Sequence, residues 1–457
     1  MMRRRSVAAG ALALASAPLA LGLLGRPALA QGTGNRTELQ FWHGLTQPLG
    51  GMLEQIAADF SESQDKFRIN ASFRGSYPDT MVAAIAAFRA GTAPHIVQMF
   101  EVGTGTMINA GRAIVPLHEL ASQTKVDLGT ADYLAAIKGY YSLPDGRLMS
   151  LPFNSSTSIV FYNKDAFRKA GLDPSKFPAT WPEVAEAMRK LKAAGFSSPM
   201  TTSWPTWLNI EQVSAIHNIP LATRANGFEG LDAELRIHNP LLVKHLGNLV
   251  EWQKEGLYRY GGRDSAADAL FPSGECPIVM ASSGLRARTV KEAKFEWGAA
   301  MLPYYPEVKG APINSIIGGA SLWVMQGGPR AQRSAAELQG IAEFFRYLGR
   351  QDIAAKWHQD TGYLPVSMGA YKATKESGFY EKNPGADVPV EQLLRGGGNT
   401  TENSRGIRLG GFPEIRNIIQ EEMERALQGN QSADQALANA QTRGNQVLRN
   451  FERTNKG

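Results

Sequence analysis

The amino-acid sequence predicts an α/β protein built from two lobes, and three observations support this prediction. The chain has 457 residues, more than the roughly 250 to 300 at which a single hydrophobic core stops growing. Short apolar segments alternate with segments of helical periodicity, which is typical of sheets covered by helices. Hydrophobic residues make up 43% and charged residues 20% of the chain, proportions of a globular protein.

The first part of the chain alternates strand and helix. We expect strands in ELQFWHG (38–44), KFRINASFRG (66–75) and HIVQMF (95–100), which are short, apolar or alternating, and bounded by polar or turn residues. Helices are expected between them, at 48–64 and 76–94, where apolar residues recur at helical spacing. Strands separated by helices indicate βαβ units and therefore a parallel sheet.

The same alternation resumes after residue 150. Strands are predicted in SIVFYN (158–163), CPIVMASSG (276–284) and SIIGGASLWVM (315–325). Helices are predicted in DAFRKAGLDP (165–174), WPEVAEAMRKLKAAG (181–195) and RSAAELQGIAEFFRYLG (333–349). Residues 385–406 are rich in Gly, Asn and Thr and are predicted to form a long irregular loop.

Residues 1–30 have the pattern of an export signal. Three arginines precede a weakly apolar run, and Ala28 and Ala30 have the spacing that a signal peptidase accepts, so we expect cleavage near Ala30. The paired arginines resemble a twin-arginine signal, and the residues that follow them leave the Sec route open. A retained membrane anchor is the weaker alternative, because Pro18 interrupts the run.

Charge and cysteine content exclude several classes of function. Without the signal, 44 basic and 42 acidic residues remain, a net charge of +2, which gives no support for nucleic-acid binding. The single cysteine, Cys276, is expected to be a buried small hydrophobe rather than a nucleophile. The motifs HExxH, GxSxG and GxxxxGK[ST] are absent, as is a cysteine pair for zinc. We therefore predict no metal site, no cofactor and no catalytic residues.

Small or hydroxyl residues follow four of the predicted strands, at EVGTGT (101–106), NSST (154–157), ASSG (281–284) and GGAS (318–321). Each alone is more typical of an ordinary turn. Together they predict a polar pocket, because ligands of α/β proteins lie at strand ends. Three tryptophans cluster between residues 181 and 207; core packing is favoured for Trp181 and ligand contact for the other two.

Two longer strings carry a family resemblance. STSIVFYNKDAFRKAGLDPSKFPATWPEV (156–184) and TGYLPVSMGAY (361–371) resemble the extracellular solute-binding proteins of ABC importers, the family of the maltose-binding protein. FWHG, EVGTGTM, WHQDTGYLP and RGIRLG are closer still to those members that bind sn-glycerol-3-phosphate. The resemblance covers essentially the whole chain after the signal.

The resemblance implies a type II periplasmic binding fold with a hinge and a ligand cleft between two lobes. Residues 36–151 with 303–357 would form one lobe, and 152–302 with 358–457 the other. The segment NTTENSRG before Arg408 departs from the relatives' pattern. The family's ligand positions fall on Tyr77, Glu101, Ser156, Ser282, Gly319, Tyr363 and Arg408, joined by the tryptophans Trp204 and Trp207.

The function implied is that of a monomeric, non-catalytic periplasmic protein that delivers sn-glycerol-3-phosphate, or a glycerophosphodiester such as glycerophosphocholine, by hinge closure. Its partners would be permease subunits in the inner membrane, with a cytoplasmic ATPase. Arg408 would bind the phosphate through paired charge-assisted hydrogen bonds, and Glu101 would accept from glycerol hydroxyls. A sugar- or oligosaccharide-binding protein is the alternative within the family. An exported glycerophosphodiester hydrolase is the alternative from another class, and it would need a metal cluster or paired carboxylates.

Overall fold

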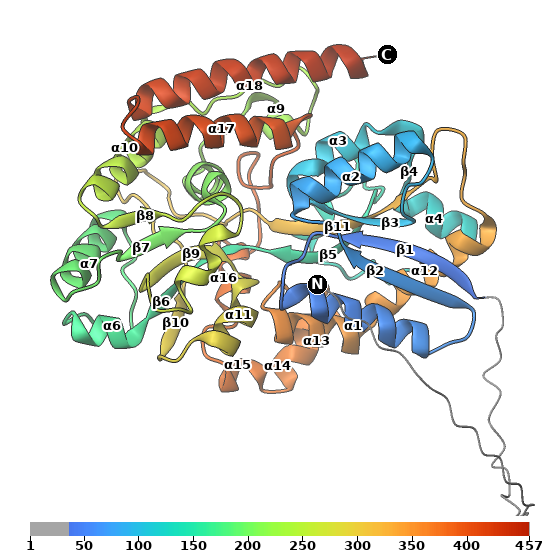
Figure 1. Cartoon of the computed structure of the whole chain (residues 1–457), viewed down its shortest axis with the longest axis horizontal. Helices are drawn as coiled ribbons and strands as arrows, with labels where there is room; N and C mark the ends of the chain where they lie inside the picture. Colours follow the sequence, from blue (N-terminus) through green and yellow to red (C-terminus); the bar gives the residue numbers. More distant parts are fainter. Residues whose placement is uncertain (1–35, 457) are drawn as a thin grey trace, which may run out of the picture. The chain divides into compact units, whose positions relative to one another are not determined.

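The computed structural model describes residues 36–456, which belong to one compact unit. The predicted export signal and its cleavage site near Ala30 lie outside the described residues. Two β-sheets organise this unit, and helices cover both of them (Figure 1). Among the described residues, no helix has the length and apolar character needed to cross a membrane.

The first sheet has six strands in the order β2-β1-β3-β11-β4, with β5 also paired to β11. The pairs β1/β2 and β1/β3 are parallel, as predicted, but β11 runs antiparallel to β3, β4 and β5. The direction of β11 differs because the chain enters it on its return from the second sheet. The strands are β1 (Thr37–His43), β2 (Phe67–Phe73), β3 (Ile96–Phe100), β4 (Ile114–Val115), β5 (Leu151–Ser156) and β11 (Gly318–Met325).

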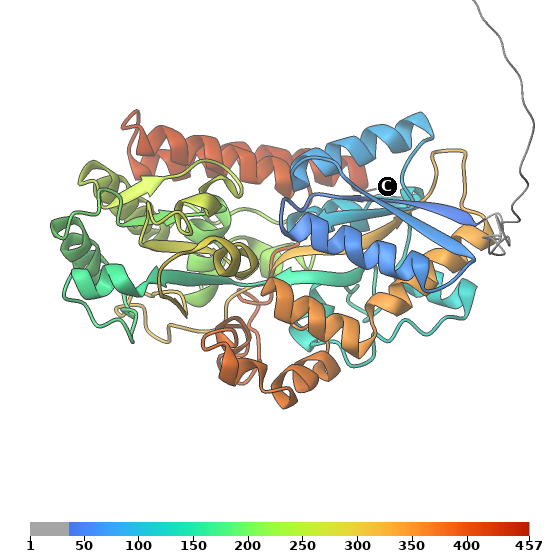
Figure 2. The ribbon, with the colours of Figure 1, turned by 60° about the horizontal axis from the view of Figure 1, so that its bottom comes forward.

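Two of the long helices that accompany the first sheet start at capping boxes. Ser76 and Asp79 form a capping box at the start of α2, and Ser334 and Glu337 do the same for α12. In Figures 1 and 2, α1 and α12 lie beside the strands β1 and β2. These helices are α1 (Leu49–Glu62), α2 (Tyr77–Ala90), α3 (Thr104–Ile108), α4 (Leu117–Thr124), α5 (Ala135–Tyr140), α12 (Ala335–Leu348), α13 (Gln351–Thr361), α14 (Met368–Glu376) and α15 (Phe379–Lys382).

The second sheet has five strands in the order β10-β6-β9-β7-β8. It is mixed, because β7 is parallel to β8 and β9 whereas β6 is antiparallel to β9 and β10. In the sequence, all five strands of this sheet lie between β5 and β11. The strands are β6 (Ser158–Asn163), β7 (Met200–Thr202), β8 (Tyr258–Tyr260), β9 (Ile278–Ser282) and β10 (Trp297–Ala300).

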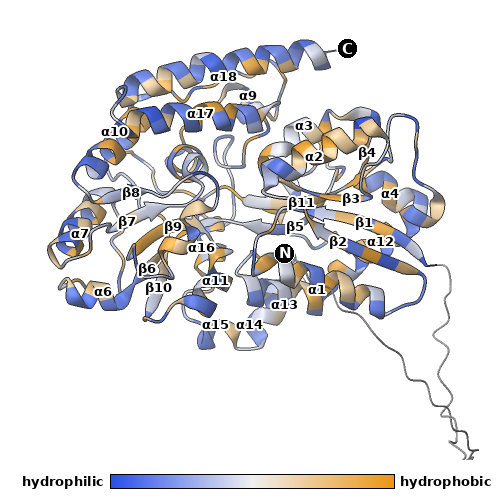
Figure 3. Cartoon of the chain, in the orientation of Figure 1, coloured by the Kyte–Doolittle hydropathy of each residue, from blue (hydrophilic) through white to orange (hydrophobic). Residues whose placement is uncertain are grey.

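Two long C-terminal helices, α17 and α18, lie side by side next to α10 (Figures 1 and 2). Hydrophilic and hydrophobic bands alternate along both helices in Figure 3, as expected of helices with one buried face. The remaining helices are α6 (Lys164–Lys169), α7 (Trp181–Ala193), α8 (Val213–Ile216), α9 (Thr223–Gly227), α10 (Pro240–Lys254), α11 (Leu285–Glu292), α16 (Val388–Leu393), α17 (Phe412–Leu427) and α18 (Ala433–Asn455).

Several smaller predictions can now be compared with the structure. Cys276 is fully buried and unpaired, as predicted, and burial raises the pKa of its thiol to about 12. The predicted loop at 385–406 is wrong in part, since helix α16 lies inside it. The division into two lobes with the boundaries given above stays a prediction, and strand β5, at the boundary after residue 151, pairs within the first sheet.

A glycine at the start of β11 allows β11 and its antiparallel partner β5 to approach each other. Gly319 has φ +85°, and a Cβ built on it would lie 2.0 Å from the carbonyl oxygen of Asn154. Both the left-handed backbone and this contact exclude a side chain. We predict that Gly319→Ala lowers the free energy of unfolding by about 2 to 3 kcal/mol, measured by urea denaturation.

Gly247, in the middle of α10, is the matched control. It has open space around the Cβ position, so Gly247→Ala is expected to leave stability unchanged or raise it by up to about 1 kcal/mol. Equal unfolding midpoints for the two variants would contradict the argument.

Candidate functional site

Eight of the nine predicted ligand residues line one cavity of about 360 Å³. This volume lies in the range of small-molecule sites. Loops and strand ends of both sheets contribute, because the cavity lies where β1, β3, β5 and β9 end and where β11 begins. The eight residues are Tyr77, Glu101, Ser156, Trp204, Trp207, Ser282, Gly319 and Tyr363.

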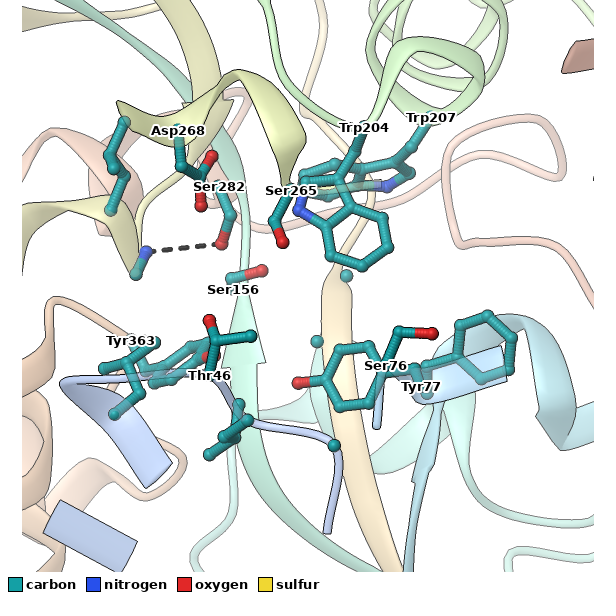
Figure 4. Close-up of a pocket in the computed structure, with 18 of the residues that line it drawn as sticks. Thr46, Ser76, Tyr77, Ser156, Trp204, Trp207, Ser265, Asp268, Ser282 and Tyr363 are labelled. Carbon is teal, nitrogen blue, oxygen red and sulfur yellow. Dashed lines mark hydrogen bonds between the residues drawn. The ribbon is translucent and has the colours of Figure 1, made fainter. Parts of the chain in front are cut away.

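Figure 4 shows how these side chains face one another. Trp204, Trp207 and Ser282 lie on the upper side of the view, whereas Tyr77 and Tyr363 lie on the lower side. The two halves of the protein are here the parts built around the first and the second sheet. Trp204 and Trp207 follow β7 and Ser282 ends β9, so the upper residues belong to the second half. Tyr77 begins α2, which accompanies the first sheet, and Tyr363 follows α13. The cavity is therefore lined from both halves, which is the arrangement needed for a ligand to bridge them.

The hydroxyl groups predicted to bind a phosphate occupy strand ends. Ser156 ends β5 and pairs with Gly318, and Ser282 ends β9. The Ser282 Oγ accepts a hydrogen bond of 3.2 Å from the backbone N–H of Gly284, drawn as a dashed line in Figure 4. This hydrogen bond uses a lone pair of the Ser282 oxygen and not its hydrogen, so the hydroxyl can still donate a hydrogen bond toward the cavity.

A chain of hydrogen bonds fixes Tyr77. Gln98 accepts from the Gly44 N–H and donates to Asn154, and Asn154 in turn donates to the Tyr77 hydroxyl, each at 2.9 Å. Burial raises the pKa of Tyr77 well above its usual value and that of Tyr363 to about 12. Both phenols are therefore neutral and can donate a hydrogen bond at any physiological pH.

The tryptophans occupy backbone of unusual geometry. Trp204 has φ +53°, in the left-handed region, and its backbone N–H donates to the carbonyl oxygen of Asp264 at 2.7 Å. Trp207 begins the π-helix η3 (Trp207–Gln212), a rare element that is frequent at functional sites. A Cβ on Gly318 would lie 2.4 Å from the Trp207 ring, so this glycine allows the indole to reach the cavity.

Arg408 is the one predicted ligand residue that the structure does not bring to the cavity. Its Nη2 donates to the carbonyl oxygens of Gly139 (3.1 Å) and Tyr140 at the end of α5. Its guanidinium also lies 4.2 Å from the ring centroid of Phe228, within a separate hollow. The side chain therefore lies outside the cavity that Ser156 and Ser282 line.

A different arginine lines the cavity, and the sequence reasoning missed it. Arg416, on α17, donates from Nε and Nη2 to both oxygens of Glu211 at 2.6 and 2.7 Å. The same Nη2 donates to Glu101 Oε1 at 2.7 Å. A signal was present in the sequence, because Phe412, Ile415 and Ile419 have the spacing of one apolar helix face, and Arg416 lies among them, where a charged residue needs a partner.

In this buried ion triad of Arg416, Glu101 and Glu211, the pKa values of Glu101 and Arg416 are shifted. All three residues are at most 8% exposed. Burial raises the pKa of Glu101 although Arg416 opposes that effect. For Arg416, burial alone would lower the pKa, but the two glutamates outweigh it and raise the pKa above its usual value.

Further residues line the cavity without having been predicted, among them Asp268 and Arg288. Burial raises the pKa of Asp268 to about 6. Neither residue stood out in the sequence, because each lies in a segment without a recognisable motif. Among residues 36–456 there is no cluster of three or more His, Cys, Asp or Glu side chains that could hold a metal ion.

Comparisons with known proteins identify the family. A family profile described as "Bacterial extracellular solute-binding protein" matches residues 55–387. The chain belongs to this family. The type II periplasmic binding fold predicted from the sequence is therefore confirmed, and solved structures of the family support it at the level of the fold.

One solved structure is UgpB from Mycobacterium tuberculosis in complex with glycerophosphocholine, with a TM-score of 0.73 and 22% sequence identity over 90% of this chain and 98% of that one. Maltose-bound MalE3 of T. maritima gives a TM-score of 0.72 at 16% identity over 89% and 99% of the two chains. At these identities the solute-binding proteins share the fold alone.

Relatives of higher identity are named for a ligand. The sn-glycerol-3-phosphate-binding periplasmic protein UgpB of Yersinia pseudotuberculosis is 44% identical over 421 residues, covering 92% of this chain and 94% of that protein. The protein of the same name from Rhizobium meliloti is 46% identical over 414 residues, covering 90% and 94%. The resemblance to this group that the sequence indicated is confirmed.

The triad makes a clear prediction for stability. Arg416→Gln leaves Glu101 and Glu211 buried without a cation, so we expect the free energy of unfolding to fall by about 3 to 5 kcal/mol in urea denaturation at pH 7. The exposed pair of Arg189 and Glu186 provides the comparison, since Arg189→Gln should cost at most about 1 kcal/mol. Similar losses for the two variants would show that the triad is not a stabilising contact.

Proposed function

We propose that this protein is the periplasmic ligand-binding component of an ABC importer, and that its cavity binds sn-glycerol-3-phosphate, a glycerophosphodiester such as glycerophosphocholine, or both. One observation carries the proposal: eight residues selected from the sequence for this ligand class line a single cavity formed by both halves of the chain. The name of the relatives at 44% and 46% identity supports the same ligand.

The chemistry of the cavity suits a phosphoester in two ways. Neutral donors for the phosphate oxygens are present in the hydroxyls of Ser156 and Ser282 and in the Gly319 N–H. Glu101 uses one oxygen for Arg416, and its other oxygen can accept from a glycerol hydroxyl. The rings of Trp204 and Tyr77, with centroids 6.0 Å apart, add apolar faces for the carbon skeleton.

Delivery would proceed by hinge closure. A ligand that contacts residues from both sheets lowers the free energy of the closed arrangement relative to the open one. Permease subunits of the inner membrane would recognise the closed form, and a cytoplasmic ATPase would drive transport. In this proposal the protein acts as a monomer in the periplasm and performs no catalysis.

Thermal unfolding tests the ligand assignment. The chain without residues 1–30 is heated with sn-glycerol-3-phosphate, glycerophosphocholine, glycerol, phosphate or maltose. A phosphoester at about 100 times its dissociation constant should stabilise the protein by about 2.7 kcal/mol, because it binds only the folded state.

A melting shift with maltose and none with either phosphoester would favour the sugar-binding alternative. Release of glycerol or phosphate from a phosphoester during incubation would favour the hydrolase. Either result would overturn the proposed function.

The position of Arg408 gives a second binding test. Since its guanidinium contacts Gly139, Tyr140 and Phe228, we expect Arg408→Gln to change phosphoester affinity by less than about threefold. Ser282→Ala removes a donor to a charged group and should weaken binding by about 10-fold or more, measured by titration calorimetry. A large loss of phosphoester affinity in Arg408→Gln, with an unchanged melting temperature, would show instead that Arg408 contacts the bound phosphate.

A further inference from the structure

The charges around the cavity are unusual for a site that receives an anion. Four charged residues line it: Glu101, Asp268, Arg288 and Arg416. Arg416 is bound to two glutamates, and Arg288 is bound to Glu292 at 2.8 Å. Each of the two arginines in the lining thus has a carboxylate partner of its own.

Asp268 is the remaining charge, and no cationic group lies within ion-pair distance of it among the described residues. Its Oδ1 accepts from the Ser203 hydroxyl at 2.5 Å. Asp268 lines the same cavity as Ser282, one of the two serines assigned to the phosphate, and Figure 4 shows both on the upper side of the view. An ionised Asp268 would therefore place a negative charge in the same partly enclosed cavity as the phosphate, where repulsion is poorly screened.

The groups that face Asp268 come from four elements. They are Ser203 after β7, Ser282 on β9, Arg288 on α11 and Tyr363 after α13. Burial raises the pKa of the carboxyl to about 6, while the Ser203 hydrogen bond and the more distant Arg288 oppose this rise. Protonation of Asp268 is thus accessible near neutral pH, whereas burial raises the pKa of Tyr363 to about 12, outside that range.

Building on the proposed function, we propose that Asp268 is a specificity-determining residue that takes up a proton when a phosphoester enters the cavity. The protonated carboxyl no longer repels the phosphate and can donate a hydrogen bond to it. Phosphoester binding is then coupled to the binding of one proton, and ligands with less negative charge are favoured as the pH rises.

The sign of the pH dependence follows from linkage. The free protein has an Asp268 that is ionised above about pH 6, and the complex has one that stays protonated to higher pH. Between these two limits the affinity falls as the pH rises, by up to tenfold per unit, because each binding event must take a proton from solution.

Glycerophosphocholine is the probe for this test, because its phosphodiester has no group that titrates near neutral pH. Its binding is measured by titration calorimetry at pH 6, 7 and 8 in buffers of different ionisation enthalpy, which reports the number of protons taken up. For the unmodified protein we expect close to one proton at pH 8 and an affinity that falls at least tenfold from pH 6 to pH 8. Asp268→Asn should take up none and should bind with the same affinity at all three pH values.

Asp264→Asn is the matched control. Asp264 is a neighbouring acid with a pKa raised by burial, but it does not line the cavity. Its φ of +47° is tolerated by asparagine. This variant should keep the pH dependence of the unmodified protein. Ser203→Ala, which removes a hydrogen bond to the ionised carboxyl, should move the onset of the affinity loss to higher pH.

The outcomes separate this inference from the proposed function. If neither glycerophosphocholine nor sn-glycerol-3-phosphate binds the unmodified protein, the proposed function fails. If glycerophosphocholine binds without proton uptake and with constant affinity, only the role of Asp268 is overturned. Weaker binding of Asp268→Asn at every pH would also overturn it, since the ionised carboxylate would then be a ligand acceptor.

Discussion

The buried ion triad of Arg416, Glu101 and Glu211 is the contact on which the rest of the site depends. Glu101 follows β3 of the first sheet, Glu211 lies in the π-helix η3 of the other half, and Arg416 is on α17. The three charged side chains come from distant parts of the chain, and the desolvation free energy of burying each one is offset only when all three are in contact. The planar guanidinium binds both oxygens of Glu211 and one of Glu101, so it fixes the distance between the walls of the cavity as well as their charge.

The same contact determines how an anion can be recognised. Because Arg416 is paired with its two glutamates, the proposed function assigns the attraction for a phosphate to neutral donors such as Ser156 and Ser282. Such donors bind an anion through directed hydrogen bonds with a smaller desolvation cost than a free guanidinium would have. Binding of this kind depends strongly on geometry and less on net charge. It suits a carrier that must discriminate between solutes and then release the one it holds.

Most errors of the sequence-based predictions concern contacts between distant segments, although helix α16 inside the predicted loop at 385–406 is a local error. Periodicity located six of the strands and the main helices between them, and strand-end hydroxyls located Ser156 and Ser282. The antiparallel direction of β11 was missed because it is set by the route of the chain through the other sheet. Arg408 was expected to bind phosphate because of the family resemblance, with which the chemistry of a guanidinium agrees. Its direction, however, depends on carbonyl groups of α5 and on Phe228, about 270 and 180 positions away. Asp268 was missed because its significance arises only from its place in the lining of the cavity.

The backbone around the tryptophans indicates that this wall of the cavity is formed before a ligand arrives. A non-glycine residue at positive φ costs of order 1 to 3 kcal/mol, yet Trp204 adopts it. Backbone hydrogen bonds hold it there: the Trp204 backbone N–H donates to the Asp264 carbonyl oxygen, and the Trp204 carbonyl oxygen accepts from the Leu208 N–H. Asn209 fixes the following π-helix by donating to Thr202 and to the Pro205 carbonyl. Since folding has already met the cost of these conformations, the free energy of ligand contact with the indoles remains available to favour the closed form over the open one.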